Sequence, residues 1–265
     1  GFEMEVAGKV IIVTGAASGI GRGLCQRFAK EGAKAIIAAD INEAGAKEVA
    51  AEVRGDAVFC DVSKEEDVIR LAKFAQDKYG RVDLFCSNAG ILGAPGGYEV
   101  ANDTWQRIWE INVLAHIFVA RAAIPEMIRQ GGGAIMITAS AAGLLSQIGS
   151  LPYSVTKHAA VGLAENLSIT YGDQGIQIFL LCPQAVESEM TRGHEAGGVA
   201  GVDGLMKVEQ LADAVMESFA ADEFLILPHK EVKTYMQRKA SDYDRWLKGM
   251  RGLQQRFVSG GPLKK

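Results

Sequence analysis

The stretch KVIIVTGAASGIGRG, residues 9–23, joins an apolar run to a glycine-rich turn. Its first seven residues have the length and nearly continuous apolarity of a strand that is covered on both faces, as in a parallel sheet. Gly15, Gly19 and Gly21 follow in a G-x-x-x-G-x-G spacing. Glycine permits a tight turn and close approach of the backbone to a phosphate at a helix N-terminus, where the Ser18 hydroxyl can also donate. The loop alone leaves two interpretations open, a nucleotide site and a strand–helix turn without a ligand.

Apolar runs of strand length recur along the chain, and segments of helical period separate them. The expected strands are 9–15, 33–40, 57–62, 82–90, 133–140, 176–183 and 223–229. The expected helices are 19–31, 42–54, 64–79, 103–130, 153–173 and 207–221. This alternation predicts an α/β fold, a doubly wound parallel sheet of about seven strands (a Rossmann fold) with helices on both faces. We expect one dinucleotide-binding catalytic domain over 4–229 and an added C-terminal helical extension over 230–265.

The composition is that of an ordinary globular protein, with 48% hydrophobic residues, 23% charged residues and a net charge of −4. The longest apolar runs reach only strand length, so we expect no membrane span. No secretory signal is visible, and we expect the three residues before Met4 to be foreign to the natural chain and no part of the fold. The four cysteines show neither metal-ligand nor paired spacing, which predicts reduced thiols in a cytoplasmic protein and no metal site.

In a sheet of this type, ligands bind beyond the carboxyl ends of the strands, near the point where strand order reverses. Asp40 ends the second expected strand, nineteen residues beyond Gly21, where a carboxylate accepts hydrogen bonds from an adenosine ribose. The same carboxylate would repel a 2′-phosphate, so we expect NAD rather than NADP. Arg22 is the nearby cation that keeps NADP open. Asp40 could instead cap the next helix, although Asn42 can do so as well.

Two more strand ends carry residues suited to the adenosine. Asp61, at the end of the third expected strand, can accept from an adenine amino group, with the Val62 amide beside it. The small-residue turn 88–90 ends the fourth strand and can let the nucleotide lie against backbone. Asn88 is expected to tie adjacent strands together.

Taken together, these residues make the chain resemble the short-chain dehydrogenase/reductase family, in its compact single-domain branch. The resemblance runs from about residue 6 to 229 and rests on Thr14-Gly15-x-x-x-Gly19-Ile20-Gly21, Asn88-Ala89-Gly90, Asn112, Ser140, Tyr153-x-x-x-Lys157 and Pro183. It implies a catalytic set of Asn112, Ser140, Tyr153 and Lys157. With the strand-end residues, the expected cofactor-binding set is Gly15, Ser18, Gly19, Ile20, Gly21, Asp40, Asp61, Val62, Asn88, Ala89, Gly90, Tyr153, Lys157, Pro183, Val186 and Ser188.

Hydride transfer between a carbinol and nicotinamide needs a group that exchanges the hydroxyl proton, and the resemblance implies that Tyr153 is that group. A free tyrosine has a pKa of about 10, so bringing it near 7 needs roughly 4 kcal/mol of preferential phenolate stabilisation. A unit charge at ~4 Å supplies a comparable energy if the effective dielectric constant is ~20. Lys157, one helical turn along, is placed to be that charge, which predicts a lowered pKa for Tyr153.

The other members of the catalytic set are expected to support the phenol. Ser140, at the tip of the fifth strand, would donate to the substrate oxygen and hold it against Tyr153. The resemblance implies that Lys157 also holds the nicotinamide ribose and that Asn112 anchors a water leading protons towards it. The alternative for Asn112 is a buried amide that a backbone carbonyl satisfies.

The spacing of Tyr153 and Lys157 has a second copy in Tyr235 and Lys239, and helical geometry places each pair on one face. In the family a serine lies thirteen residues before the tyrosine, as Ser140 does here. The second pair has no such serine and follows the last expected strand. We therefore interpret it as surface or packing residues.

The substrate side departs from the family pattern after the sixth strand. Gln184 replaces the usual glycine, and Ser188 takes the place of a threonine that meets the carboxamide of nicotinamide. The segments 91–100, 141–152 and 188–206 should surround the reactive carbon. The expected substrate contacts are Leu92, Leu145, Gln147, Gln184 and Met190. A neutral, hydrophobic secondary alcohol or ketone fits these mainly apolar segments better than a sugar phosphate or an acyl carrier.

The leading expectation is therefore an NAD-dependent alcohol dehydrogenase or ketone reductase. An oxoacyl-thioester reductase is one alternative, which usually prefers NADPH and is disfavoured by Asp40. A dinucleotide-sensing protein with weak catalysis is another, and the intact Ser140, Tyr153 and Lys157 speak against it.

The C-terminal extension differs in charge from the rest of the chain. From Lys230 onward ten Lys and Arg stand against three Asp and Glu, while the remainder has 18 against 29. An apolar stripe of helical period, with aromatic residues, lies between these cations. Nucleic acid or an anionic membrane would suit such a segment, but docking onto the body or a neighbouring subunit buries the stripe and pairs opposite charges. We expect a homo-oligomer, a dimer or tetramer, with no nucleic-acid or membrane partner, and an extension at an oligomer contact or beside the catalytic mouth.

Overall fold

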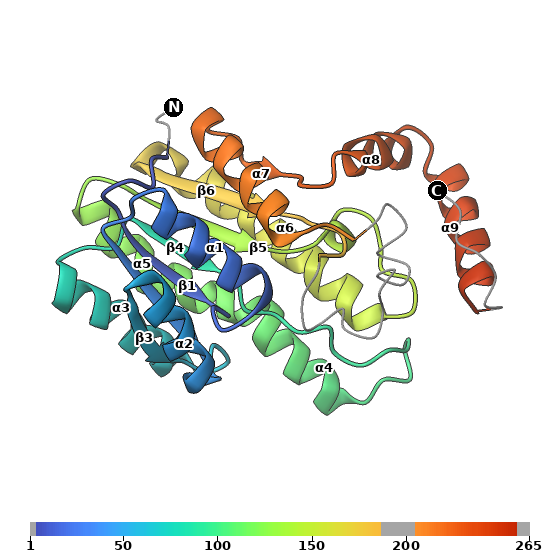
Figure 1. Ribbon diagram of the computed structural model, residues 1–265. Helices are drawn as coiled ribbons and strands as arrows, with labels where there is room; N and C mark the ends of the chain where they lie inside the picture. Colours follow the sequence, from blue (N-terminus) through green and yellow to red (C-terminus); the bar gives the residue numbers. More distant parts are fainter. Residues whose placement is uncertain (1–3, 187–204, 259–265) are drawn as a thin grey trace.

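The computed structural model describes residues 4–186 and 205–258 of the 265-residue chain. In these ranges the centre is a seven-stranded parallel sheet in the order β3-β2-β1-β4-β5-β6-β7 (Figure 1). The strands are β1 (Val10–Thr14), β2 (Ala35–Asp40), β3 (Asp56–Phe59), β4 (Leu84–Ser87), β5 (Gly133–Thr138), β6 (Ile176–Leu181) and β7 (Leu225–Ile226). The predicted doubly wound parallel sheet is confirmed.

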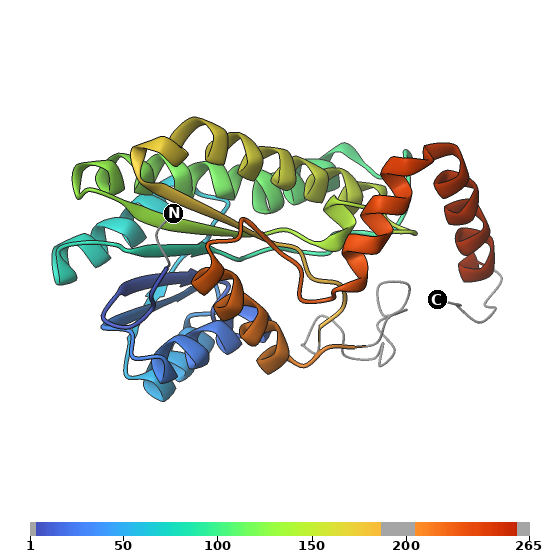
Figure 2. The ribbon, with the colours of Figure 1, turned by 90° about the horizontal axis from the view of Figure 1, so that it is seen from above.

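Helices cover both faces of the sheet (Figure 2). They are α1 (Gly19–Lys30), α2 (Glu43–Val53), α3 (Glu65–Tyr79), α4 (Asn102–Trp109), α5 (Ala115–Arg129), α6 (Leu151–Tyr171), α7 (Val208–Ala221), α8 (Glu231–Ser241) and α9 (Tyr243–Val258). One apolar core joins the sheet to α3, α5 and α6, and a second joins it to α1, α2 and α7. Every residue of β1 is buried, because a central strand of a parallel sheet has a helix layer on each side.

Strand order reverses between β1 and β4. Val13 of β1 is in register with Ala38 of β2 on one side and with Cys86 of β4 on the other. The chain leaves β1 towards β2 and β3, then returns to the opposite side of β1 as β4. The loops after β1 and β4 therefore diverge at the carboxyl edge of the sheet, which is where α/β folds of this kind bind ligands.

The helix expected over 103–130 is interrupted. α4 ends at Trp109, a π-helical segment spans Glu110–Leu114, and α5 begins at Ala115. A π-helical turn inserts one extra residue into a helix and is common at functional sites. The apolar period of the sequence does not mark it, because the whole stretch stays helical.

By length and hydropathy, the continuous helical stretch Asn102–Arg129 would also suffice to cross a membrane, contrary to the expectation that apolar runs reach only strand length. Half of its most apolar window is buried inside the fold, as in the core helix of a globular protein.

The extension after residue 229 forms two helices where the sequence predicts one. α8 ends at Ser241, and Asp242 leaves the helical conformation. The Asp242 side chain then accepts a hydrogen bond from Arg245 N over 3.1 Å, and its carbonyl accepts from Trp246 N. Asp242 is thus a helix N-cap. Figure 1 shows α8 and α9 at the end of the molecule opposite α3 and β3.

All four cysteines are buried and unpaired as disulfides. Burial raises the pKa of Cys25, Cys60 and Cys182 to about 12 and that of Cys86 well above its usual range. Within the described ranges, no group of three or more His, Cys, Asp or Glu is arranged to hold a metal ion.

Candidate active site

The turn after β1 is held against the turn after β4. Gly15 has a φ of +65°, and a Cβ there would lie 3.0 Å from the Cα of Ala89, so the two turns meet backbone to backbone. Thr14 Oγ1 accepts hydrogen bonds from Asn88 N over 3.0 Å and from Ala89 N over 3.2 Å. Asn88 Nδ2 donates to Thr14 O, and Thr138 Oγ1 donates to Asn88 Oδ1. Asn88 therefore joins the ends of β1, β4 and β5.

The N-terminus of α1 opens beside this turn. A Cβ on Gly21 would lie 2.1 Å from the carbonyl oxygen of Gly15, so only glycine fits there. Gly19 begins α1, and the exposed Ser18 is its N-cap residue without a side-chain capping bond. Ile20 is half-buried in the same turn. Because first-turn amides have no partner within the helix, this turn and the Ser18 hydroxyl suit an anion such as a pyrophosphate.

Asp40 ends β2 next to the same turn. Its Oδ2 accepts from Ala17 N and its Oδ1 from Asn42 N, each over 2.9 Å. Asn42 caps α2, since its Oδ1 accepts from Gly45 N over 3.0 Å. Asp40 is therefore not needed as the cap, and its carboxylate lies at the carboxyl edge of the sheet, held by two backbone amides.

Arg22, the cation that keeps NADP open in the sequence, pairs with a different carboxylate. Its guanidinium forms an ion pair with Glu52 of α2. Glu52 also accepts a hydrogen bond from Gln26 Nε2 over 2.7 Å. The ion pair balances the Arg22 charge locally.

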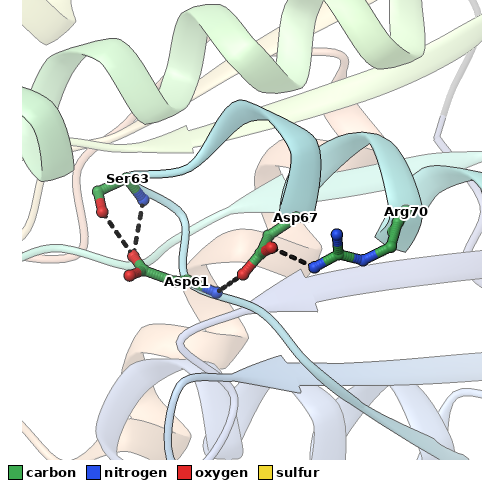
Figure 3. A network of polar contacts seen from close by, with 4 residues as sticks. All are labelled: Asp61, Ser63, Asp67 and Arg70. Carbon is green, nitrogen blue, oxygen red and sulfur yellow. Dashed lines mark hydrogen bonds and ion pairs between the residues drawn. The ribbon is translucent and has the colours of Figure 1, made fainter.

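Asp61 and Val62 follow β3, which ends at Phe59, earlier than the sequence suggests. Asp61 Oδ1 accepts from both the amide and the hydroxyl of Ser63 (Figure 3). Asp61 N donates to the buried Asp67, which pairs with Arg70. Burial works to raise the pKa of Asp61, but the Ser63 hydrogen bonds outweigh it and hold that pKa below its usual range. The carboxylate is thus charged and oriented by its own loop, while Val62 is buried beside it.

Ser140, Tyr153 and Lys157 come together where β5 and α6 meet. Ser140 follows β5 and caps a short 3₁₀ turn, where its Oγ accepts from Ala142 N over 3.0 Å. The Ser140 side chain lies beside the Tyr153 hydroxyl, whose pKa it acts to lower. Lys157 Nζ lies 5.5 Å from the centroid of the Tyr153 ring. Ser140 Oγ also donates to Pro183 O over 3.4 Å, which places Pro183 at the same point.

The pKa of Tyr153 is raised in the structure, not lowered as the sequence argument predicts. Burial of the phenol is the main cause, the hydrogen bond with Ser140 opposes it, and Cys182 adds to it. Lys157 is itself only 4% exposed, and burial lowers its pKa to about 8. Burial disfavours the charged form of both groups, the Tyr153 phenolate and the Lys157 ammonium, so the expected lowering of the Tyr153 pKa does not result.

Asn112 lies in the π-helical segment and is fully buried. Its Oδ1 accepts from Ile91 N, and its Nδ2 donates to Ile91 O, both over 2.9 Å. Nδ2 also donates to Thr156 Oγ1 of α6 over 3.2 Å. A Cβ on Gly90 would lie 3.2 Å from Lys157 Nζ and 3.4 Å from Asn112 Oδ1. Asn112, Gly90 and Lys157 are therefore neighbours, and backbone groups satisfy the Asn112 amide, as the second interpretation of that residue requires.

His116 is a buried titratable residue near this group that the sequence argument missed. It lies one turn after Asn112 on α5 and is 1% exposed. Its Nδ1 shares a hydrogen bond of 2.7 Å with Ser87 Oγ at the end of β4. Burial, with a smaller contribution from the Lys157 charge, lowers its pKa to about 3. A histidine inside an otherwise apolar helix stretch was the available signal.

Four of the five expected substrate contacts lie among the described residues. Leu92 is 48% exposed, and Leu145 and Gln147 are half-buried in the loop between the Ser140 turn and α6. Gln147 N donates to Ser154 Oγ over 2.8 Å, which ties this loop to α6. Gln184 N donates to His229 Nδ1 over 3.1 Å.

Two of the expected site residues lie outside the described residues. These are Ser188 and Met190. Val186, the last described residue before the gap, is buried and forms an isolated parallel bridge with Met206.

The second Tyr-x-x-x-Lys pair lies on α8. Lys239 Nζ donates to the carbonyl of Leu144 over 2.9 Å and so contacts the loop next to Ser140. The interpretation of this pair as packing residues agrees with this contact.

Residues 9–197 match the short chain dehydrogenase family. The chain belongs to the short-chain dehydrogenase/reductase family. It is 34% identical over 247 residues to 1-deoxy-11-beta-hydroxypentalenate dehydrogenase of Streptomyces exfoliatus, covering 90% of each chain. It is also 35% identical over 225 residues to the mitochondrial borneol dehydrogenase of Lavandula x intermedia, covering 83% of this chain and 86% of the relative.

The fold agrees with solved structures of the same family. A short chain dehydrogenase/reductase of Burkholderia phymatum, in complex with NAD, superposes with a TM-score of 0.83 at 27% identity. The match covers 91% of this chain and 96% of that one. The chain is thus an oxidoreductase of the dehydrogenase type.

Proposed function

We propose that this oxidoreductase is an NAD-dependent dehydrogenase of a neutral, hydrophobic secondary alcohol, interconverting it with the ketone. The observation that carries the proposal is the meeting of Ser140, Tyr153 and Lys157 at the carboxyl edge of the sheet, next to the end of β4. Such a group can exchange a proton with a bound carbinol, and the adjacent glycine turn suits a dinucleotide.

The residues present fit the cofactor. The contact of Gly21 with Gly15 brings α1 against the turn after β1, with no side chain over the first-turn amides at that point. Ser18, Gly19 and Ile20 would hold the pyrophosphate, and the Asp40 carboxylate would accept from the adenosine ribose and repel a 2′-phosphate. When bound, NAD accepts or returns the hydride.

The adenosine end and the nicotinamide end would use the remaining members of the expected set. Asp61 and Val62 would meet the adenine, and the 88–90 turn would pass beneath the nucleotide. Pro183 and Val186 would face the nicotinamide, with Lys157 on its ribose. Gly90 has no side chain, which leaves Lys157 and Asn112 free to lie directly beside it.

In this reaction Tyr153 is the general acid or base. Its raised pKa makes it a proton donor at neutral pH, which suits ketone reduction. Alcohol oxidation needs the phenolate, and the Lys157 ammonium, mostly protonated at pH 7 with a pKa of about 8, is the positive charge that the chain itself supplies. Ser140 orients the substrate oxygen against the phenol. Asn112 keeps the Gly90–Ile91 backbone in place beside Lys157.

Two observations support the substrate class. Leu145 and Gln147 lie in the loop after the Ser140 turn, and Leu92 and Gln184 lie in the segments that follow β4 and β6, where they would offer apolar contact and two amides. The two relatives described above are named for dehydrogenation of a hydroxypentalenate and of borneol. Both relatives support an alcohol as the substrate. That it is neutral and apolar rests on the residues near Ser140, because pentalenate is itself a carboxylate.

The test is a panel of cyclic, aromatic and aliphatic carbinols, with an acetoacetyl thioester for the oxoacyl-reductase alternative, followed by absorbance of reduced cofactor. We expect turnover of cyclic secondary alcohols with NAD. Tyr153→Phe should lose at least about a hundredfold in kcat, the lower end of general acid–base contributions, while NAD still binds by calorimetry. Turnover of the thioester alone would favour the alternative. Equal activity of wild type and Tyr153→Phe would overturn the proposal.

The chain functions as a cytoplasmic homo-oligomer in this proposal, without nucleic-acid or membrane partners. The buried reduced thiols suit a reducing compartment. A groove of about 470 Å³ between α5 and α6 is lined mostly by apolar side chains, and its one cation pairs with Glu65. A second copy packed on this face would cover it. Leu167→Glu places a charge in the groove and should shift the mass measured by light scattering towards the monomer.

A further inference from the structure

The helices α8 and α9 contribute little to the core of the protein. Among their described residues only Val232 is buried. Both helices nevertheless contact one short loop, residues 144–150, which connects the Ser140 turn to the start of α6. Figure 2 shows α8 and α9 together at one end of the fold.

Lys239 makes the contact from α8. Its Nζ donates to the carbonyl of Leu144 over 2.9 Å, although 95 residues separate the two in sequence. The same Nζ lies 5.0 Å from the ring centroid of Trp246 and 5.7 Å from that of Tyr243. The two rings meet edge to face. A partly buried ammonium needs partners of this kind, because desolvation penalises its charge.

Phe257 makes the contact from α9. Gly149 has a φ of +89°, and a Cβ added to it would lie 3.4 Å from Phe257 Cε1. The phenyl ring therefore packs against the Cα of Gly149. Two helices thus hold the two ends of the loop, near residues 144 and 149.

Hydrogen bonds connect the held loop to the backbone of the two segments that carry Ser140 and Tyr153. Leu145 N donates to Ala141 O over 2.8 Å, inside the turn that Ser140 caps. At the other end, Ser150 Oγ accepts from Tyr153 N over 3.3 Å at the beginning of α6. A displacement of the loop would therefore move the surroundings of both side chains.

We propose that α8 and α9 clamp the 144–150 loop, and that Lys239 is a positioning residue that lets the enzyme accept large apolar alcohols. This inference rests on the proposed function. The loop carries Leu145 and Gln147, so its position sets the wall against which a ring skeleton packs while its hydroxyl reaches Tyr153. A small alcohol such as propan-2-ol contacts the catalytic side chains without reaching that wall.

The kinetic test compares Lys239→Met with Lys233→Met, a matched change on the exposed side of α8. For Lys239→Met we expect the KM for borneol to rise about tenfold with kcat within about twofold, a loss of uniform binding. The KM for NAD and for propan-2-ol should not change. Lys239→Arg retains a donor for the Leu144 carbonyl, so its KM for borneol should stay close to that of wild type. Equal KM values for the two Met variants would overturn the proposal.

A second measurement does not depend on activity. Amide hydrogen exchange in 144–150 should accelerate in Lys239→Met relative to wild type and Lys233→Met, because the loop loses its hydrogen bond to α8. Unchanged exchange overturns the clamp. If wild type oxidises no alcohol of the panel, the proposed function fails, while accelerated exchange in Lys239→Met still supports the clamp.

Discussion

The side-chain amide of Asn112 and the backbone of Ile91 exchange two hydrogen bonds, each 2.9 Å long. Ile91 lies beyond the end of β4, where the strand ladder has stopped, and the amide supplies it with both a donor and an acceptor. The remaining Nδ2 hydrogen reaches Thr156 on α6. One side chain thus fixes the backbone that follows Gly90 against the helix that carries Lys157.

Asn112→Asp tests this relationship, because the carboxylate keeps the acceptor and loses the donor. Ile91 O is then left without its partner in a half-buried position, which costs about 1–3 kcal/mol. We expect the free energy of unfolding in urea to fall by that amount. Asn166→Asp, on the exposed side of α6, should change it by less than about 0.5 kcal/mol. A similar loss in both variants would contradict the assignment.

The contact of Gly21 with Gly15 makes a second prediction. In Gly21→Ala the new Cβ would lie 2.1 Å from the Gly15 carbonyl oxygen, so α1 must move away from the turn after β1. We expect the dissociation constant of NAD, measured by calorimetry, to rise at least about tenfold, or 1.4 kcal/mol. Gly162→Ala is the control, because its Cβ meets nothing within 4 Å in α6. There the same change should leave NAD binding unaltered and stabilise the helix by roughly 0.5–1 kcal/mol.

Asp40 supports a prediction about cofactor choice. Asp40→Asn keeps an acceptor for a backbone amide and removes the negative charge at the end of β2. The ratio of kcat/KM for NAD to that for NADP should fall about tenfold or more, mainly through better use of NADP. Glu43→Gln removes a charge from the first turn of α2 and should leave the ratio as it is. An unchanged ratio in Asp40→Asn would place the discrimination elsewhere.

His116 should make the protein sensitive to acid. Its pKa is about 3 in the folded chain against an ordinary 6.5, so the unfolded chain binds an extra proton between these values. The stability that the neutral imidazole contributes is complete above pH 6.5 and is lost as pH falls towards 3, by about 1.4 kcal/mol per pH unit. His116→Asn should have a shallower decline of urea stability between pH 6 and 4. A slope equal to that of wild type would mean that other groups cause the acid response.

Sequence reasoning reaches the fold and the members of the candidate site because both depend on local patterns. Continuous apolar runs mark β1 and β6, and Gly15, Asp40 and Ser140 were found at strand ends, where a parallel sheet gathers its chemistry. Boundaries are less accurate: β3 ends before Asp61, and the predicted C-terminal helical extension is interrupted at Asp242.

What sequence reasoning misses depends on contacts between distant segments. The bond from Lys239 to Leu144 spans 95 residues and leaves no periodic trace. The pKa of Tyr153 was predicted from the distance to a charge, but burial by the folded surroundings decides its direction. His116 shows the same limit, because its hydrogen-bond partner Ser87 lies on β4 and cannot be identified from the pattern of its own helix.

The four cysteines have a practical consequence. Each thiol is at most 2% exposed and stays protonated at neutral pH, so alkylating reagents and mild oxidants reach it only when the surrounding segment opens. Cys25 sits on α1, Cys86 on β4 and Cys182 just after β6. Counting modified thiols by mass spectrometry over time would therefore record the order in which the segments that carry them unfold.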